Sequence, residues 1–403
     1  MADTAPKVAE AERRESPSLV DKKAALLAEK IKTSNHFIAF TGAGISTSAG
    51  IPDFRGPDGV WTLRAQGRKR TGKATSTLQA IPTPTHMALV ELQNRGLLKY
   101  LVSQNCDGLH RKSGISSDRI SELHGNSNRE YCKDCGKEYI RDFRAVATYE
   151  VSVYDHRTGR KCVKCGGVLF DSIVNFGESL PEEPFKRAHD NAKKADLCLA
   201  LGSSLTVTPA NEITEIVGKK KRGRGVGGQL VICNLQSTPL DDLSELRVWS
   251  TTDDLMIRVM EKLGIPIPRF VLRRRLVLQL ETTESGKHQL TVQGVDEDGT
   301  PATFLQSVKL AYNRRVVRSE PFAFNFRGEL DTGTELKLEL EFMGHYGEPN
   351  LEIVHVVNEK TSRILHLLEY DPMTGEWKTT TEEGADDDTG LERDISIIDL
   401  TSD

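Results

Sequence analysis

Two pairs of cysteines carry the first spacing that could support chemistry. The pairs read CKDC at residues 132–135 and CVKC at residues 162–165, and a glycine follows each pair directly. Each pair can supply two ligands to a metal ion from a tight turn. Together the four thiolates complete a tetrahedral zinc site without an open coordination position. The spacing therefore predicts a structural zinc ion, with a redox-active dithiol pair as the alternative. The expected ligands are Cys132, Cys135, Cys162 and Cys165.

A second candidate site begins in the stretch FTGAGISTSAGIPDFRG at residues 40–56. Gly42 and Gly44 follow an apolar run directly, as glycines do in the phosphate-binding turn of a dinucleotide fold. Ser46, however, stands where the third glycine of the GxGxxG pattern belongs, and the Gly-Ile-Pro run at 50–52 interrupts the helix that should follow. The stretch therefore predicts a nucleotide site covered by a mobile Pro/Gly-rich flap. This flap would present Asp53, Phe54 and Arg55 to the nucleotide.

Polar residues follow further apolar strands of the predicted sheet. SQNCDGLH begins at residue 103 after one strand, LGSSL begins at residue 201 at the end of a second, and NLQ follows a third. Open α/β sheets bind ligands at the carboxyl ends of their strands, and Gly-Ser turns there supply donors for phosphates and ribose. Each motif is weak alone, but together they indicate a dinucleotide. The residues concerned are Gln104, Asn105, Asp107, Gly202, Ser203, Ser204, Asn234 and Gln236.

His124, in the run SELHGN, is the candidate general base, because an unperturbed imidazole titrates near neutral pH. A purely structural histidine is the alternative. Cys106, near it in the predicted site, admits a cysteine nucleophile, although no other residue in the sequence indicates that this thiol is activated. Cys198 and Cys233 lie in predicted core strands, and we interpret them as packing residues.

Alternating strands and helices would position these residues. Short apolar strands are predicted at residues 36–40, 98–102, 196–202 and 230–233, with helices such as 84–95 and 181–195 between them. Nearly continuous apolar strands that alternate with helices indicate a parallel sheet covered on both faces. We therefore expect one α/β unit at residues 19–265, interrupted by a small zinc-binding insertion at about 128–170.

The pattern changes after the run GIPIPRF at residues 264–270. ELKLELEF at 335–342 alternates apolar and charged residues, which is typical of a strand with one solvated face. Several such strands predict an antiparallel β region at 270–378. The polar residues 1–18 are expected to form a disordered lead, and the acidic residues 379–403 a disordered tail.

Composition limits the class of protein. Of the 403 residues 37% are hydrophobic, so the chain can bury a large core in two or three structural units. The net charge of −4 does not by itself predict nucleic-acid binding, and the basic clusters at 67–70, 219–224 and 273–275 are either solvated surface or a nuclear-import signal or DNA-facing patch. No apolar run is long enough to span a membrane, and no secretory signal is evident. We therefore expect an intracellular protein without membrane contact or disulfides.

In chain order, the motifs GAGIS, GIPDFRG, QNCDGLH, ELHGN, the two CxxC pairs, FGE, GSSL and NLQ resemble those of the sirtuins, which are NAD-dependent protein-lysine deacylases. The resemblance covers about residues 19–265. GPDGVWT, THMAL, SQNCDGLH and NLQ are similar to the nuclear, chromatin-associated class IV branch, and HRTGRKCVKCGG is most similar to its nucleolar subgroup. The region after residue 270 lies outside the resemblance.

The resemblance implies a Rossmann-like large domain and a small zinc-bearing domain, with NAD and an acyl-lysine peptide meeting in the cleft between them. NAD would be a co-substrate. Its binding positions would be Gly42, Ala43, Thr47, Asp53, Phe54, Arg55 and Trp61 at the flap, Gln104 and Asn105 at the nicotinamide ribose, Asp107 at the carboxamide, Gly202, Ser203, Ser204, Asn234 and Gln236 at the adenosine half, and Thr252 near the adenine. The peptide would add as a strand to Val174, Phe176, Gly177 and Glu178.

The resemblance also implies the reaction. The acyl oxygen of the substrate lysine would attack the anomeric carbon as nicotinamide leaves, in a dry pocket under Phe54. With Asn105 as the second catalytic residue, His124 would then deprotonate the ribose hydroxyls, so that the acyl group ends on ADP-ribose. Histones are the expected substrates. A protein mono-ADP-ribosyltransferase, and a chromatin-binding module with weak catalysis that contacts nucleosomes through the basic clusters, remain open as alternatives.

The last ten residues, DISIIDLTSD at 394–403, place an apolar, β-prone core among acidic residues. This arrangement suits the addition of a strand to a basic sheet edge, and it resembles a SUMO-interacting motif. SUMO or a SUMOylated protein is therefore an expected partner, and a sticky disordered end is the alternative.

Overall fold

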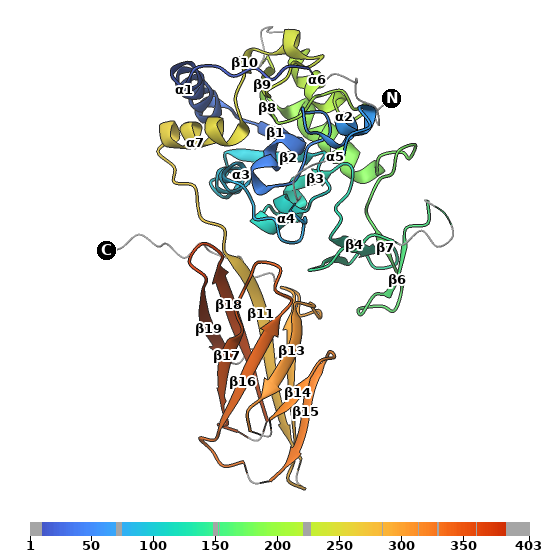
Figure 1. The fold of residues 1–403 in the computed structure, drawn as a ribbon, viewed down its shortest axis with the longest axis vertical. Helices are drawn as coiled ribbons and strands as arrows, with labels where there is room; N and C mark the ends of the chain where they lie inside the picture. The colour runs from blue at the N-terminus through green and yellow to red at the C-terminus, as the bar shows by residue number, and fades with distance from the viewer. Residues whose placement is uncertain are drawn as a thin grey trace.

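The computed structural model describes residues 10–69, 75–147, 152, 154–220, 227–283, 285–312, 314–328, 330–359 and 361–383. A six-stranded sheet lies at the centre of the N-terminal part, in the order β10-β9-β8-β1-β2-β3, and each neighbouring pair is parallel (Figure 1). Its strands are β1 (Phe37–Thr41), β2 (Leu98–Ser103), β3 (Ile120–Glu122), β8 (Leu197–Leu201), β9 (Gln229–Cys233) and β10 (Leu246–Val248). All residues of β1 and β8 are buried, which explains their continuous apolar sequences.

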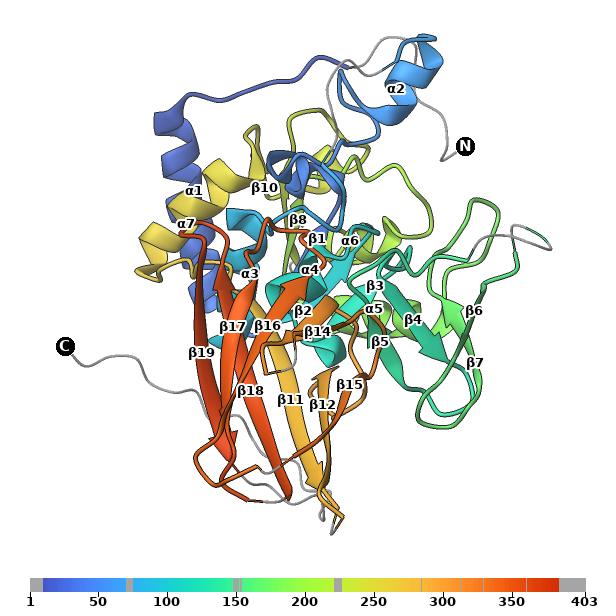
Figure 2. The same ribbon diagram turned by 60° about the horizontal axis from the view of Figure 1, so that its bottom comes forward.

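Helices cover both faces of this sheet (Figures 1 and 2). Helices α1 (Pro17–Thr33), α3 (Pro84–Asn94) and α7 (Thr252–Leu263) share one apolar core with the sheet, and α5 (Glu182–Lys194) and α6 (Glu212–Gly218) share a second core on the opposite face. Two short helices, α2 (Val60–Ala65) and α4 (Leu109–Ser113), follow β1 and β2 in the chain. The predicted α/β class with a covered parallel sheet is confirmed. No described helix has the length and apolar character that a membrane span requires.

The order of the strands indicates where a ligand-binding crevice should lie. β1 lies between β2 and β8, so the chain first builds the sheet toward β3 and later returns to the other side of β1. In open parallel sheets, ligands bind outside the carboxyl ends of the strands at such a reversal. The loops after β1 and β8 therefore form the expected wall of a binding site.

A four-stranded antiparallel sheet, in the order β5-β4-β7-β6, is inserted between β3 and α5. Its strands are β4 (Arg129–Cys132), β5 (Glu138–Ile140), β6 (Arg157–Lys161) and β7 (Val168–Asp171). This small sheet carries both CxxC pairs, and it projects from one side of the central sheet (Figure 1). We refer to residues 129–171 as the cysteine module.

The C-terminal part contains two antiparallel sheets, in the orders β15-β12-β11-β18-β19 and β14-β13-β16-β17. The strands are β11 (Leu272–Thr282), β12 (Lys287–Val295), β13 (Leu305–Leu310), β14 (Arg315–Val317), β15 (Phe322–Arg327), β16 (Glu335–Phe342), β17 (Leu351–Val356), β18 (Thr361–Asp371) and β19 (Glu376–Glu383). Both sheets contribute to one apolar core, so they pack as a sandwich. The alternating run in β16 is confirmed, because Leu336, Leu338, Leu340 and Phe342 are buried in this core.

The sandwich contacts the cysteine module directly. Arg274 Nη2 lies 2.6 Å from Asp142 Oδ2, and His345 Nε2 lies 2.7 Å from the carbonyl oxygen of Asp142. Lys137 Nζ lies 2.6 Å from Asp298 Oδ2 in the turn after β12. The C-terminal β region thus packs on the module, and it also packs on the central unit, where Met87 of α3 shares a buried apolar cluster with Phe270, Leu272 and Tyr370.

The segment before α1 is ordered where the structure describes it, unlike the disordered lead expected at 1–18. The backbone amides of Arg13 and Glu15 donate to the carbonyls of Leu235 (2.7 Å) and Trp249 (2.9 Å), beyond the ends of β9 and β10. These bonds give residues 10–16 a fixed path that a composition-based prediction cannot anticipate.

At the other end, β19 continues to Glu383 by pairing with β18, so the β region passes the boundary expected at residue 378. The predicted SUMO-interacting stretch at 394–403 lies outside the described residues.

Candidate active site

A cavity of about 370 Å³ opens at the carboxyl ends of the central strands. Its wall consists of the loops after β1, β2, β3, β7, β8 and β9. The volume is in the range of small-molecule sites, and the position is the one that strand order indicates. Of the predicted site residues, the following line it: Gly42, Ala43, Asp53, Phe54, Arg55, Trp61, Gln104, Asn105, His124, Val174, Phe176, Gly177, Glu178, Gly202, Ser203, Ser204, Asn234 and Gln236.

The glycines after β1 are required by close contact with the loop after β8. The amide of Gly42 donates to the carbonyl of Leu201 at 3.0 Å, and the amide of Gly44 donates to the carbonyl of Gly202 at 2.8 Å. A Cβ on Gly42 would lie 2.7 Å from the Gly202 oxygen, and a Cβ on Gly44 would lie 2.7 Å from the Gly202 Cα. Such distances leave no room for a side chain, so the two loops meet backbone to backbone at the cavity wall.

Ser46, at the position of the missing third glycine, is a buried anchor. Its hydroxyl donates to Asp107 Oδ2 at 2.7 Å, and Asp107 Oδ1 accepts from the amide of Leu109 at 2.9 Å. Asp107 is only 7% exposed and is not among the described residues that line the cavity. It therefore holds the glycine turn from behind the cavity wall.

Two further predicted nucleotide contacts also lie away from the cavity lining in the described structure. The hydroxyl of Thr47 donates to the carbonyl of Gly44 at 3.1 Å, on an exposed turn. Thr252 is the first residue of α7 and is buried, with its hydroxyl 3.2 Å from that of Thr85.

The chain after the glycine turn forms two 3₁₀ turns, at Ala43–Ile45 and Thr47–Ala49, in place of a long helix. Gly50 ends the second turn with a φ of +83°, a left-handed conformation that favours glycine. The flap that follows closes on itself, because the amides of Val60 and Trp61 donate to the carbonyls of Asp53 and Phe54. The sequence prediction that the helix is interrupted at 50–52 is confirmed.

Three aromatic rings lie between the flap and the loop after β7. Phe54 stacks on Trp61 with centroids 5.9 Å apart, and Trp61 meets Phe176 edge-on at 5.8 Å. Phe54 and Phe176 remain 45% and 57% exposed. Exposed aromatic rings at a cavity mouth are suited to cover a bound ligand and exclude water from it.

Two amide side chains after β2 are fixed in the cavity wall. The Asn105 amide nitrogen donates to the carbonyl of Gly42 at 3.1 Å, and Gln104 Oε1 accepts from the Ser203 hydroxyl at 2.7 Å. These bonds join the loop after β2 to the loops after β1 and β8. The three loops therefore hold one another in position around the cavity.

His124 follows β3 and is positioned for proton transfer. Its Nδ1 lies 2.9 Å from the carbonyl oxygen of Gln104, which can only accept, so Nδ1 carries the hydrogen and Nε2 keeps its lone pair. Burial lowers the pKa of His124 below its ordinary value, although the bond to Gln104 opposes this shift. The neutral imidazole is thus favoured near pH 7, as a general base requires.

Cys106 does not have the surroundings of a nucleophile. Its thiol donates to the carbonyl of His124 at 3.1 Å rather than to the imidazole. Burial, with the negative charges of Asp107 and Glu122, raises the pKa of this thiol to about 12. A thiolate is therefore scarce at neutral pH, and the structure disfavours a cysteine nucleophile.

The cavity wall also contains residues that the sequence did not single out as site positions. Asn175 and Leu180 lie in or beside the predicted peptide segment, and residues 207–209 follow the GSSL motif after β8. The rule that strand ends carry ligand contacts could have found the second group. The complete additional set is Gly56, Asn175, Leu180, Val207, Thr208 and Pro209. The cavity is also lined by Gly44 and Cys106, which belong to the motifs GAGIS and QNCDGLH.

The four predicted ligand cysteines meet at one point of the cysteine module. Their sulfur atoms all lie within 4.8 Å of one another, and the pairs Cys132–Cys165 and Cys135–Cys162 are 3.5 and 3.6 Å apart. Zn–S bonds of ~2.3 Å in a tetrahedron give sulfur separations of ~3.8 Å, so this donor set fits zinc. None of the four lines the cavity, so the zinc would be structural.

The surroundings of the sulfurs support this fit. Gly136 and Gly166, one after each pair, have φ of +73° and +77°, which allows the tight turns that sequence predicted. The hydroxyl of the fully buried Tyr139 lies 3.1 Å from Cys162 Sγ and accepts from the amide of Val163. A partner of this kind orients a metal ligand.

Comparison with known proteins assigns these features to one family. The model described as "Sir2 family" matches residues 65–209. The NAD-dependent protein deacetylase SRT1 of Arabidopsis thaliana is 38% identical over 346 residues, which cover 78% of this chain and 71% of that protein. The NAD-dependent protein deacetylase sirtuin-7 of Homo sapiens is 41% identical, covering 65% of this chain and 66% of that protein.

A third relative is the NAD-dependent protein deacetylase Sirt6 of Drosophila melanogaster, which is 38% identical and covers 64% of this chain and 80% of that protein. The relatives named sirtuin-7 and Sirt6 fit the class IV branch that the motifs resemble. Because the identity with the Arabidopsis protein extends over more than two thirds of its length, the chain belongs to the Sir2 family.

Proposed function

We propose that this chain is an NAD-dependent protein-lysine deacylase that transfers the acyl group to ADP-ribose and releases nicotinamide. The observation that carries the proposal is the placement of His124. The His124 side chain, whose Nε2 can accept a proton, lines the cavity. The glycine turns after β1 and β8 and the loop at 174–178 line the same cavity. A dinucleotide and a peptide side chain can therefore both reach the same base.

The nucleotide side of the cavity is the wall made by the two glycine turns. The backbone contact at Gly42, Gly44 and Gly202 leaves a surface without side chains, which phosphates can approach closely. Ser203, Ser204 and Asn234 line the same wall and offer hydroxyl and amide groups to the ribose and phosphates. NAD would supply the ribose carbon to which the acyl oxygen bonds.

The chemical steps use groups fixed in the wall. Asn105, held by the Gly42 carbonyl, would orient the nicotinamide ribose, and His124 would take a proton from a ribose hydroxyl. The rings of Phe54, Trp61 and Phe176 would exclude water while the bond to nicotinamide is broken. Asp107 would act indirectly, by holding the glycine turn through Ser46.

The loop after β7 is the proposed peptide-binding segment, with Val174, Phe176, Gly177 and Glu178 in the cavity wall. Main-chain bonding of the peptide to this segment would read little of its sequence, and so would accept several acyl-lysine substrates. Histones and a nuclear location are proposed from the similarity to sirtuin-7 and Sirt6. We also propose residues 19–265 as the catalytic domain, with the zinc module inserted, and the β region from 270 as a separate domain.

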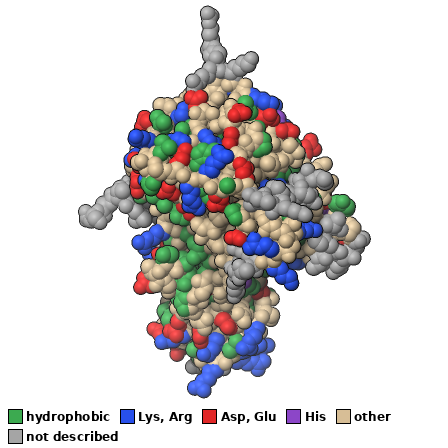
Figure 3. Space-filling model, turned by 45° about the horizontal axis from the view of Figure 1, so that its top comes forward, with side chains coloured by type: hydrophobic (Ala, Val, Ile, Leu, Met, Phe, Trp, Pro, Cys, Tyr) green, Lys and Arg blue, Asp and Glu red, His purple; other side chains and the backbone are tan. Residues whose placement is uncertain are grey.

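DNA contact through the basic clusters receives little support from the one cluster that is fully described. Arg273 pairs with Glu369 at 2.9 Å, and Arg274 pairs with Asp142 at 2.6 Å. On the face that Figure 3 shows, basic and acidic side chains are interspersed over the upper part of the molecule. Binding to nucleosomes would therefore depend on residues other than this cluster.

Mass spectrometry of the products from NAD and a panel of acyl-lysine peptides tests the proposal. Formation of acyl-ADP-ribose with free lysine supports a deacylase. Attachment of ADP-ribose to protein without loss of the acyl group would replace the proposal with a mono-ADP-ribosyltransferase. No consumption of NAD with any peptide would leave only a binding role.

A further inference from the structure

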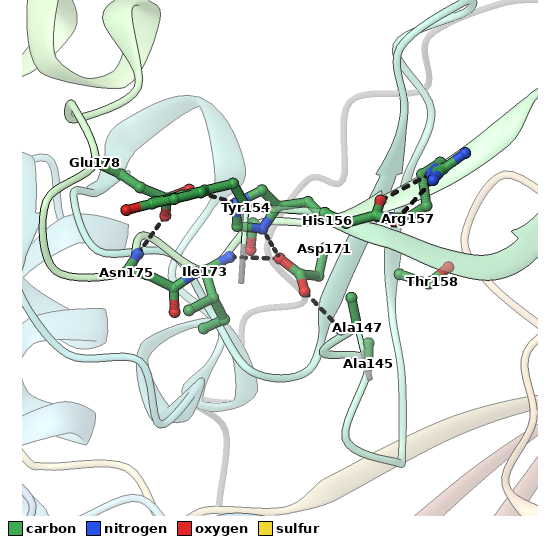
Figure 4. A network of polar contacts seen from close by, with 12 residues as sticks. Ala145, Ala147, Tyr154, His156, Arg157, Thr158, Asp171, Ile173, Asn175 and Glu178 are labelled. Atoms are coloured by element: carbon green, nitrogen blue, oxygen red, sulfur yellow. Dashed lines mark hydrogen bonds and ion pairs between the residues drawn. The ribbon is translucent and has the colours of Figure 1, made fainter. Parts of the chain in front are cut away.

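An imidazole between two carboxylates lies beside the proposed peptide-binding loop (Figure 4). His156 precedes β6 in the cysteine module. Its Nδ1 lies 2.8 Å from Asp171 Oδ1, at the end of β7, and its Nε2 lies 2.8 Å from Glu178 Oε1, in the loop. His156 is the first residue of the run HRTGRKCVKCGG, but no role in the site was predicted for it from the sequence, and the proposed reaction does not use it.

The two contacts require two hydrogens on the ring. Ionised carboxylates only accept hydrogen bonds, whereas a neutral imidazole has a single N–H. The arrangement is therefore complete only with an imidazolium between Asp171 and Glu178. Partial burial lowers the pKa of His156, but the bonds to Glu178 and Asp171 outweigh it, and the pKa is raised above its ordinary value.

Few other charges face this ring. Asp155, its chain neighbour, is engaged by Arg157, with two nitrogen–oxygen distances of 2.8 Å. Lys133 and Tyr131 line a second cavity of about 170 Å³ together with His156, Asp171 and Glu178. Among the described residues, the two carboxylates are thus the groups that bond the imidazole directly.

Both carboxylates also hold the backbone of the loop. Asp171 Oδ1 accepts from the amide of Ile173 at 3.1 Å, and Asp171 Oδ2 accepts from the amide of Ala147 at 2.6 Å. The second carboxylate oxygen of Glu178 accepts from the amide of Asn175, which closes the turn at 175–178. Asp171 is therefore fixed within the module, and Glu178 is fixed within the loop.

We propose that His156 is a positioning residue, whose imidazolium ties Glu178 to the cysteine module and so holds the loop at 173–178 in the shape that binds the acyl-lysine peptide. The role rests on the proposed deacylase function. It gives the zinc-bearing module a direct connection to the substrate side of the cavity, because Val174, Phe176 and Glu178 line that cavity.

Loss of one proton from His156 should release the loop. One ring nitrogen would then present a lone pair to a carboxylate oxygen 2.8 Å away, which is repulsive. Asp171 is held by two backbone amides, so Glu178 is the carboxylate that moves. Since the folded pKa is raised, the tie is complete below the ordinary histidine pKa of about 6.5 and is lost as pH rises through the folded value.

The first test is the KM for an acetyl-lysine peptide that has no other group titrating in the range, measured from about pH 6 to about pH 9. For the wild-type chain the peptide KM should rise roughly tenfold with pH, as expected for the loss of one charged hydrogen bond, while the KM for NAD stays constant. His156→Gln should show the high peptide KM at every pH. The matched control is His189→Gln on α5, where the ring meets Phe185 edge to face with centroids 5.3 Å apart; this variant should follow the wild-type curve.

The second test does not depend on turnover. NMR titration of selectively labelled histidine should give His156 a pKa above the ordinary value, and Glu178→Gln should lower it. If the wild-type chain forms no acyl-ADP-ribose, the proposed function fails, while this titration still decides whether the tie exists. The inference is overturned if His156 has an ordinary pKa that Glu178→Gln does not change. It is also overturned if the peptide KM changes neither with pH nor in the His156→Gln variant.

Discussion

Replacing His124 by alanine separates the two halves of the proposed reaction. The only side-chain hydrogen bond described for its ring is the one from Nδ1 to the carbonyl of Gln104, so its removal costs about 1 kcal/mol of folding free energy. A positioned general base contributes roughly 100- to 10,000-fold to a rate, which corresponds to about 3–5 kcal/mol of transition-state stabilisation. The variant should therefore remain folded and lose acyl transfer.

The assay follows two products from the same mixture of NAD and acetyl-lysine peptide. Formation of acyl-ADP-ribose should fall by that factor of roughly 100 to 10,000 in the His124→Ala variant. Exchange of labelled nicotinamide into NAD should fall by less than about tenfold, because release of nicotinamide precedes the proton transfer. His189→Ala, on α5, serves as the control for loss of a histidine outside the cavity and should retain both reactions.

The dependence of the reaction rate on pH gives a further test of His124. Burial lowers the pKa of His124, so the neutral base persists below the ordinary histidine value of about 6.5, and the wild-type rate should fall only in more acidic solution. This acidic limb should be absent in His124→Ala. Wild-type acyl transfer in the variant, or an equal loss of exchange and transfer, would refute the assignment of His124 as the base of the second half-reaction.

Three further perturbations test the parts that support the site. Removing the metal, or changing Cys135 to serine, should release zinc and unfold the cysteine module, and an unchanged thermal transition in demonstrably metal-free protein would contradict a structural zinc. Ser46→Ala should raise the KM for NAD roughly tenfold with a small change in melting temperature, because the turn loses its bond to Asp107; an unaltered KM counts against this support. His355 and His366 are 1% and 4% exposed, and burial lowers the pKa of both, so the melting temperature of the C-terminal sheets should fall as pH drops below about 6.5 and His366→Leu should flatten that fall.

One geometric rule predicts part of the cavity wall, and the resemblance to the sirtuins implies the rest, such as Trp61 and the loop at 174–178. The carboxyl ends of parallel strands meet at one edge of the sheet, so motifs that follow separate apolar runs must come together. Gly42, Asn105, His124 and Ser203 line one cavity for this reason. The rule places a loop at the edge but does not give the direction of each side chain, which is why Asp107 follows the same strand as Asn105 and yet points behind the wall.

Contacts between distant loops leave no comparable pattern. His156 bonds to carboxylates 15 and 22 positions away across an irregular small sheet, and no periodicity in the sequence links them. Lys137 meets Asp298 across 161 positions. These pairs depend on how the cysteine module is oriented, which composition and spacing do not fix.

The cysteine module contacts both the proposed peptide-binding loop and the C-terminal sheets, and these sheets also pack directly on the central α/β unit, where Met87 shares an apolar cluster with Leu272 and Tyr370. On one side His156 connects the module to the peptide loop, and on the other Lys137 and Asp142 connect it to the C-terminal sheets. The proposed zinc would take no part in the chemistry, because none of the four cysteines lines the cavity. Because the described residues of the module share one small apolar cluster, around Tyr139, we expect the rigidity of the module to depend on the metal. Loss of zinc should therefore weaken peptide binding before it weakens NAD binding, since the nucleotide wall is built on the central sheet and the peptide loop is held from the module.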